Sequence, residues 1–125
     1  MILADTSVWI EFLRGNEPYF SGLTSLMELT RVRTTDIIFG ELLQGAKNAR
    51  ERNMIKSFWD YVPKANVSEI WIKAGEYASV HVLPQKGIGL IDAAIAVSAK
   101  ETHCKIWSLD AKLLAFLKAE SFPIY

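Results

Sequence analysis

Cysteine is scarce in this sequence: Cys104 is the only one among 125 residues. A single cysteine can form neither an internal disulfide nor a cysteine cage for zinc, which excludes a disulfide-stapled module and a zinc finger. An excess of positive charge is also missing, because 14 basic side chains balance 14 acidic ones. Bulk charge therefore provides no attraction for a polyanion, and any contact with one requires a local patch or a bound cation.

Long hydrophobic runs are absent as well. The longest apolar stretch, residues 90–99, contains Asp92 and Ser98 and is too short to span a bilayer. The N-terminal residues have no basic segment before an apolar run, so we expect no signal peptide. Half of the residues are apolar and 22% are charged, which is typical of globular proteins. We expect one domain over residues 1–125 and a cytoplasmic location.

Short apolar runs alternate with segments of helical periodicity along the chain. The expected strands are residues 1–4, 33–38, 61–67, 105–109 and 122–125. The expected helices are residues 7–14, 20–30, 39–45, 49–61, 68–77, 91–101 and 110–118, with a loop at 84–89. Such alternation predicts an α/β fold in which a parallel sheet of four or five short strands has helices on both faces.

Four acidic residues lie after expected strands or at the start of helices, at the edge where ligands bind in such sheets. They are Asp5, Glu41, Asp92 and Asp110. Taken singly, Asp5 and Asp110 are most simply helix N-caps. Glu41 fits that interpretation less well, because Glu is not a preferred cap. Asp92 fits least, because its neighbours are apolar and no basic residue lies close to it in sequence.

Carboxylates gathered in one pocket repel one another and raise one another's pKa values, and a divalent cation removes that conflict. Oxygen ligands in an open, hydrated site suit Mg²⁺ or Mn²⁺. Other candidates are weaker. His81 and His103 have no acid or cysteine at metal-ligand spacing, and Ser7 has no obvious base beside it. Lys47 and Arg50 belong to a basic cluster that is more typical of a solvated helix face than of an RNA-binding patch.

Four segments together resemble the motifs of the PIN-domain family, specifically its VapC-type ribonuclease toxins. The start Ile2-Leu3-Ala4-Asp5-Thr6-Ser7 resembles the first motif, and Glu41-Leu42-Leu43-Gln44-Gly45 resembles the second. Asp92-Ala93-Ala94-Ile95-Ala96 resembles the third, and Ser108-Leu109-Asp110 resembles the fourth. No single motif is specific, but their order and spacing match the family over nearly the whole chain.

The resemblance implies a three-layer α/β/α sandwich with an acidic pocket that holds Mg²⁺ or Mn²⁺. It implies endonucleolytic cleavage of RNA, a homodimer, and a cognate antitoxin that inhibits the site. Carried over by position, Asp5, Glu41, Asp92 and Asp110 are the metal-binding and catalytic acids, and Ser7 is a polar neighbour. We expect Asp5 and Asp92 to hold the principal metal, and the other two acids to complete its shell or orient the attacking water.

Two other functions stay open from the residues alone. One is a metal-dependent phosphatase or phosphotransfer domain on a similar sheet, although Ser7 stands where a haloacid-dehalogenase-like site has its second Asp. The other is a domain without catalysis that binds a partner, and the presence of all four acids speaks against it. We also expect apolar stripes on two helices to form a dimer or antitoxin surface; they contain Phe20, Leu23, Leu26 and Met27, and Ile55, Phe58 and Trp59.

Overall fold

The structure is a computed structural model that describes residues 1–125. Its elements are β1 (Ile2–Ala4), α1 (Thr6–Leu13), α2 (Tyr19–Glu28), β2 (Val32–Arg33), α3 (Asp36–Gln44), α4 (Ala49–Tyr61), α5 (Ile70–Val80), the 3-10 helix η1 (Leu83–Lys86), α6 (Leu90–Glu101), β3 (Lys105–Trp107) and α7 (Ala111–Ala119). None of the helices combines the length and the apolar character that crossing a membrane requires. The alternation of strands and helices confirms the predicted α/β class.

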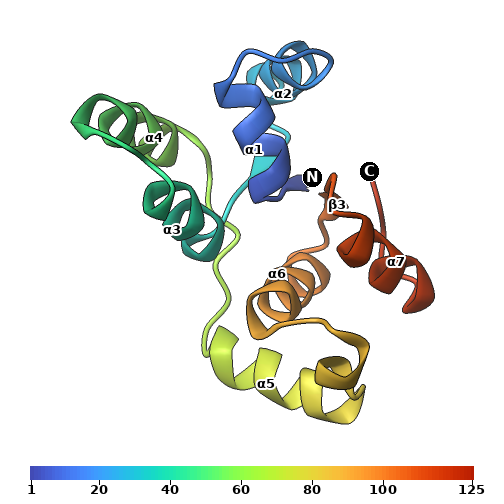
Figure 1. The fold of residues 1–125 in the computed structure, drawn as a ribbon. Helices are drawn as coiled ribbons and strands as arrows, with labels where there is room; N and C mark the ends of the chain where they lie inside the picture. Colours follow the sequence, from blue (N-terminus) through green and yellow to red (C-terminus); the bar gives the residue numbers. More distant parts are fainter.

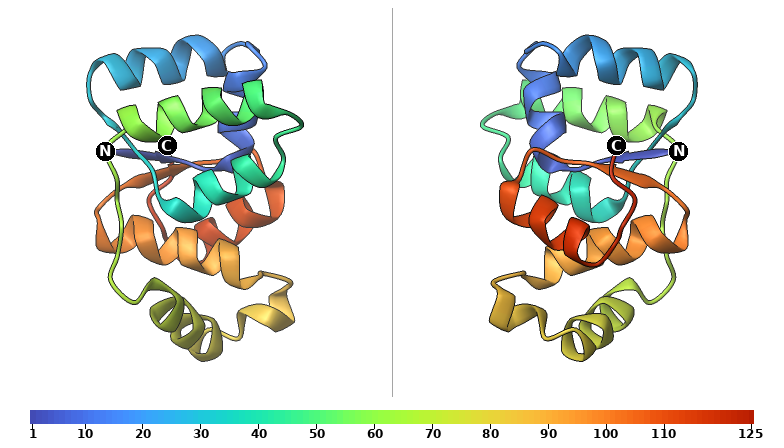
Figure 2. Two further views of the ribbon diagram at one scale, coloured as in Figure 1. Left: turned by 90° about the vertical axis from the view of Figure 1, so that its left-hand side faces the viewer. Right: turned by 90° about the vertical axis from the view of Figure 1, so that its right-hand side faces the viewer.

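The sheet is parallel and has three strands in the order β2-β1-β3. Ile2 lies opposite Val32 on one side and Lys105 on the other, and Ala4 lies opposite Trp107. In the left view of Figure 2, β1 runs from the N-terminus on the left and the chain enters α1 on the right. The right-hand side of that view is therefore the carboxyl edge of the sheet.

The predicted number of four or five strands is wrong. Residues 61–67 and 122–125 each contribute one isolated parallel bridge, Thr34 with Lys64 and Ile106 with Ile124. Proline explains why neither bridge grows into a ladder. Pro63 precedes the first bridge and Pro123 precedes the second. The carbonyl of each proline accepts a hydrogen bond from the neighbouring strand. Neither proline has an N–H to donate, so the pairing cannot extend.

Helix α3 begins earlier than the sequence pattern indicates, and the strand expected at residues 33–38 is only Val32–Arg33. The hydroxyl of Thr35 accepts a hydrogen bond from the N–H of Ile38 at 3.3 Å and so caps the helix. The β-branched side chains of residues 34–38 favour a strand. The Thr35 cap outweighs that preference and starts the helix at Asp36. The loop expected at 84–89 likewise begins inside the 3-10 helix η1.

Helices cover both faces of the sheet, with α1 and α2 on one face, α6 and α7 on the other, and α5 packed outside α6 (Figures 1 and 2). Helix α3 contacts α1 and α4 as well as α6, so it closes the β2 side of the molecule. Thirty-one buried apolar residues form one continuous core. Ala93 to Ala99 of α6 are all buried, as their nearly unbroken apolar sequence predicts.

The two apolar stripes expected to form a partner surface belong mostly to the core. Leu23, Leu26, Met27 and Ile55 are all buried. Phe58 and Trp59 are partly buried and pack against the core, while Phe20 stacks on Phe12 with ring centroids 5.3 Å apart. The helices of this small domain cover most of these side chains without a partner, but Phe20 stays 44% exposed.

Candidate active site at the carboxyl edge of the sheet

Asp5 is buried directly after β1, with 5% of its surface exposed. Its Oδ1 caps helix α1 by accepting hydrogen bonds from the N–H groups of Ser7 (3.0 Å) and Val8 (3.3 Å). The Ser7 hydroxyl also donates to Oδ1, and the Ser108 hydroxyl donates to Oδ2. The expectation that Asp5 is an N-cap is therefore confirmed, and both of its oxygens point into a network of donors.

Two serines join the loop after β1 to the loop after β3. Ser7 Oγ accepts a hydrogen bond from the N–H of Leu109 at 2.9 Å, and Ser108 Oγ accepts one from the N–H of Asp110 at 3.0 Å. Each hydroxyl thus donates to Asp5, but only Ser7 accepts from the other segment, because the Asp110 N–H that bonds to Ser108 lies in the same loop as Ser108. This arrangement fixes the position of Asp110, which caps α7 by accepting from the N–H groups of Lys112 and Leu113.

Glu41 lies in the middle of α3, not in a capping position. Its Oε1 accepts a hydrogen bond from the Thr6 hydroxyl at 2.7 Å. Because Thr6 opens α1 beside Asp5, this bond draws α3 to the carboxyl edge of the sheet. The second oxygen of Glu41, Oε2, accepts no hydrogen bond from the chain.

Asp92 lies in the first turn of α6, partly buried, and its carboxylate accepts no hydrogen bond from any side chain or backbone group. Burial raises its pKa above the ordinary value, and the negative charges of Asp110, Glu41 and Asp5 raise the pKa further. The pKa of Asp5 is raised as well, by burial, and the hydrogen bonds from Ser108, Ser7 and Val8 oppose that rise. The structure therefore places all four predicted acids at one edge, where the other three act electrostatically on Asp92.

The donor chemistry of this cluster suits a hydrated divalent cation. No three His, Cys, Asp or Glu side chains lie close enough together to enclose a metal ion by themselves. Mg²⁺, however, commonly keeps several waters and binds through one or two carboxylates. Both oxygens of Asp92, Oε2 of Glu41 and Oδ2 of Asp110 have no partner in the chain. These residues therefore fit Mg²⁺ or Mn²⁺ held partly through water.

Three residues at the site were not singled out as functional from the sequence. Thr6 orients Glu41, Ser108 donates to Asp5, and the positive charge of Lys112 lowers the pKa of Asp92. For Thr6 and Ser108, the sequence indicated a role only by placing a hydroxyl residue in the first and fourth motif segments. Lys112 is far from Asp92 in sequence, and only the folded chain brings its charge near.

The remaining candidates lie elsewhere. His81 pairs with Glu120 at 3.4 Å beyond the C-terminal end of α5, and His103 is exposed in the turn before β3. Cys104 is a buried free thiol in the core. None of the three lies among the acids of the carboxyl edge.

A groove of about 460 Å³ adjoins the acids between α1, α3 and α4. Its apolar side chains are Ile10, Leu13, Leu42, Ala46, Met54 and Ile55. Its charged side chains are the basic Arg14, Lys47 and Arg50 and the acidic Glu41 and Glu51. Because Glu41 belongs both to the groove and to the acidic cluster, a molecule lying in the groove reaches the candidate active site.

An α/β fold with an acidic carboxyl edge is the arrangement that the four sequence motifs predict, and comparison with known families agrees. The model of the PIN domain matches residues 2–118, and the chain therefore belongs to the PIN domain family. Comparison with the curated proteins found no match.

Several solved structures share this fold over the whole chain. VapBC2 from Rickettsia felis, bound to a DNA fragment from its promoter, is 19% identical with a TM-score of 0.73 and covers 100% of this chain and 98% of its own. VapBC-1 from nontypeable Haemophilus influenzae is 23% identical with a TM-score of 0.72, covering 100% and 97%. FitAcB from Neisseria gonorrhoeae is 24% identical with a TM-score of 0.66, covering 100% and 96%. At these identities the likeness concerns the fold.

Proposed function

We propose that this chain is a metal-dependent endoribonuclease and the toxin of a type II toxin–antitoxin pair. The observation that carries the proposal is the electrostatic position of Asp92, a carboxylate without a hydrogen-bond partner whose pKa is raised by burial and by three other acids. A structural carboxylate is normally stabilised by donors, as Asp5 is here. Four mutually repelling acids at a ligand-binding edge are instead typical of a cation site.

The residues would divide the work according to their present contacts. Asp92, free of hydrogen bonds, and the buried Asp5 would hold the principal cation, directly or through water. Glu41, oriented by Thr6, and Asp110, fixed by its role as a cap, would complete the shell or orient the attacking water. The hydroxyls of Ser7 and Ser108 would keep the Asp5 carboxylate ionised and in place.

When bound, the divalent cation supplies charge neutralisation at the scissile phosphate and lowers the pKa of a bound water. The chain itself contributes orientation. Asp5 is held by four donors from two loops, so its carboxylate cannot swing as the substrate enters. Oδ1 accepts three of these hydrogen bonds and Oδ2 only the one from Ser108, so a lone pair of Oδ2 stays available to a cation.

An antitoxin partner is part of the proposal, and the groove between α1, α3 and α4 is the surface that fits one. Its apolar floor and basic rim suit an amphipathic segment that carries acidic side chains. Occupation of the groove would cover Glu41 and so block the acidic cluster. Solved toxin–antitoxin complexes with the same fold support the presence of such a partner.

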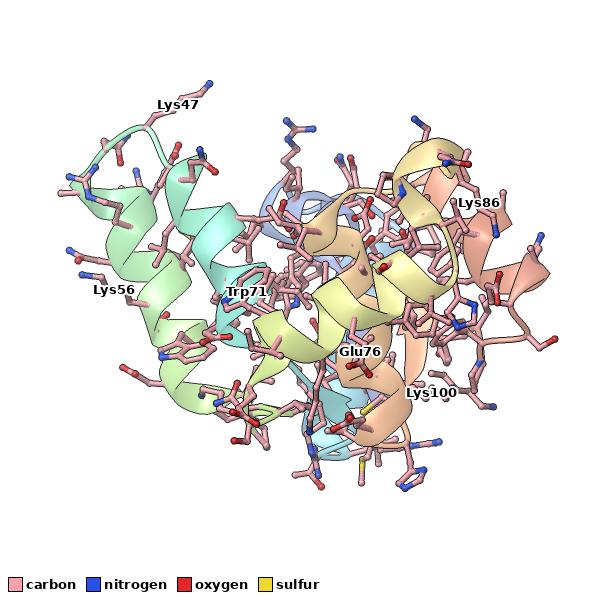
Figure 3. The ribbon with its side chains drawn as sticks, turned by 90° about the horizontal axis from the view of Figure 1, so that it is seen from below. Lys47, Lys56, Trp71, Glu76, Lys86 and Lys100 are labelled. Atoms are coloured by element: carbon pink, nitrogen blue, oxygen red, sulfur yellow. The ribbon has the colours of Figure 1, made fainter.

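A homodimer belongs to the same proposal. The face of α5 carries exposed apolar side chains, among them Trp71 at 47%, Ile72 at 72% and Val80 at 70% (Figure 3 labels Trp71). Exposed apolar surface of this kind favours association. Sedimentation of the isolated protein, with Ile72→Glu as the interface variant, tests this; a monomeric wild type would reject the dimer.

The central experiment is incubation of the purified protein with single-stranded RNA, with Mg²⁺, with Mn²⁺ and with a chelator. We expect cleavage with either metal and none with the chelator, and sequencing of the new RNA ends would give the cleavage position. Asp92→Asn is the matched inactive variant, because the amide is nearly isosteric with the carboxylate. Equal cleavage by this variant would mean that another site or a contaminating nuclease does the work.

A further inference from the structure

The side chain of Lys112 connects two loops at the carboxyl edge of the sheet. Lys112 lies in the first turn of α7, where its N–H donates to the capping carboxylate of Asp110 at 2.9 Å. Its aliphatic chain and ammonium lie across Gly87, the residue after η1: a Cβ placed on Gly87 would be 3.1 Å from Lys112 Nζ. Gly87 has φ +75°, so the backbone and the missing side chain both make room for the lysine.

This position is not explained by stability. A cation in the first turn of a helix faces the positive end of the helix dipole, which is unfavourable. Lys112 also forms no ion pair to compensate, whereas Lys86 in η1 pairs with Glu120 at 3.5 Å. The Nζ of Lys112 donates no hydrogen bond to any group of the chain.

The charge of Lys112 is nevertheless directed at the acidic cluster. It lowers the pKa of Asp92, while the neighbouring acids raise it. The backbone of Lys112 bonds to Asp110, and its ammonium lies against Gly87, two residues before the Gly89 N-cap of the helix that carries Asp92. The ammonium forms no ion pair with these acids and is free to bind an anion at the cluster. One divalent cation does not balance four carboxylates, so a phosphate entering the site needs this additional positive charge.

Two further lysines flank this part of the molecule. Lys47, on the turn between α3 and α4, and Lys86, on η1, lie on opposite sides of the molecule in Figure 3. Lys86 is engaged with Glu120, and Lys47 belongs to the rim of the groove. Lys112 is therefore the cation that is both unpaired and directed at the acids.

We propose that the Lys112 ammonium binds a phosphate oxygen of the RNA backbone at the acidic cluster and holds the strand there for cleavage. The inference rests on the proposed ribonuclease function and adds to it the residue that positions the substrate. Gly87 has a part in it, because a Cβ at that position would lie 3.1 Å from Nζ and would require the ammonium to shift by a few tenths of an ångström.

The experiment compares Lys112→Gln with Lys118→Gln, a matched control in the last turn of the same helix, where a cation is favourable. Both changes are made in an Asp92→Asn background to prevent cleavage. Binding of a short, labelled, random-sequence single-stranded RNA is measured by anisotropy over roughly 50 to 200 mM salt. Loss of one phosphate contact should flatten the slope of log K against log salt by about 0.7 for Lys112→Gln. Lys118→Gln should leave the slope unchanged.

A second measurement separates substrate binding from a counter-ion role. With Asp92 intact, Lys112→Gln should bind Mn²⁺ about threefold more tightly, because one screened positive charge near the acids is removed. Its RNA cleavage should nevertheless fall at least tenfold, and Lys112→Arg should restore part of it. The melting temperature should not fall, whereas a structural role would lower it.

The outcomes distinguish this inference from the proposed function. An active wild type combined with an unchanged salt slope or unchanged cleavage in Lys112→Gln overturns the role of Lys112 and leaves the ribonuclease in place. A wild type that neither binds nor cleaves the RNA pool overturns both.

Discussion

The Ser108 hydroxyl donates a hydrogen bond to Oδ2 of Asp5, across 103 positions of sequence. Ser108 follows β3 and Asp5 follows β1, which are neighbours in the sheet. Both side chains are buried, with 6% and 5% of their surfaces exposed. The bond therefore stabilises a carboxylate that burial alone would tend to protonate, and it ties two of the four motif segments into one unit.

Ser108→Ala should destabilise the protein by about 1–3 kcal/mol, because it leaves a buried acceptor without its donor. The pKa of Asp5 should rise further, since the Ser108 bond opposes the effect of burial. Chemical unfolding measures the first effect, and the pH at which cleavage falls measures the second.

The matched control for that change is Ser98→Ala. Ser98 is as well buried as Ser108, but its hydroxyl has no hydrogen-bond partner. Its removal should cost nothing and can stabilise by up to about 1 kcal/mol. If both variants lose the same stability, the contact with Asp5 is not what makes Ser108 important.

Asp92→Asn should abolish cleavage and yet give a more stable protein at neutral pH. The amide removes one charge from a cluster of mutually repelling acids, and gains of about 0.5–2 kcal/mol are common when strained functional sites are relieved. Thermal melting checks the stability. Mn²⁺ at one hundred times its Kd should stabilise the wild type by about 2.7 kcal/mol and so raise its melting temperature. The variant should show little of this stabilisation.

A destabilised Asp92→Asn variant that still cleaves RNA would contradict this account. It would mean that Asp92 is a paired structural charge rather than a member of the site. Asp60→Asn in α4 is a suitable control, because Asp60 is exposed and away from the carboxyl edge.

Stability should also fall as the pH rises through the acid range. Burial raises the pKa values of Asp5 and Asp92 in the folded protein above the ordinary aspartate value of 3.8, and neighbouring acids raise that of Asp92 further. The folded state therefore holds these protons more tightly than the unfolded state. Their contribution to stability is complete below about pH 3.8 and is lost as the pH rises through the raised values. Cleavage changes in the opposite sense, because it requires the ionised acids.

The difference between wild type and Asp92→Asn isolates this effect from other titrating groups. The two proteins should have similar stability well below pH 3.8, where Asp92 is protonated in both the folded and the unfolded state. Their melting temperatures should separate as the pH increases, with the variant higher. A constant difference across the whole range would show that Asp92 does not titrate as its surroundings require.

Much of the site followed from sequence because it depends on topology. Parallel strands end at one edge, so residues that follow β1 and β3 had to meet there, and Asp5 and Asp110 do cap the next helices. Glu41 and Asp92 were singled out because neither suits a structural cap, Asp92 least because its sequence neighbours are apolar, and the family motifs supported both. Lys112 did not follow, because its relation to Asp92 depends on how α7 packs beside the turn at Gly87.

The fold was predictable at the level of class and less so in its details. Helix α4 begins and ends where its periodicity indicates, with Asn48 as its cap. The number of strands was overestimated because a short apolar run next to a proline resembles a strand in sequence. In the structure, Pro63 and Pro123 limit each of these runs to one bridge. The partner stripes were misplaced because periodicity shows which face of a helix is apolar, but not what covers it.

The groove supports a prediction about the antitoxin. Met54 lines the groove from α4 and is 42% exposed, so Met54→Glu should leave the core intact while placing a charge on an apolar docking surface. Losing one buried methionine contact costs about 1.5–3 kcal/mol, which corresponds to roughly a 10- to 100-fold weaker complex with the cognate antitoxin. Cleavage of RNA by the free variant should be unchanged, since Met54 is not among the acids. Leu29→Glu, in the turn after α2, is the control, because Leu29 is exposed and does not line the groove. Titration of the antitoxin, co-produced from the partner gene, measures both affinities. Equal weakening by the two changes would place the antitoxin outside the groove, and so would no weakening by Met54→Glu.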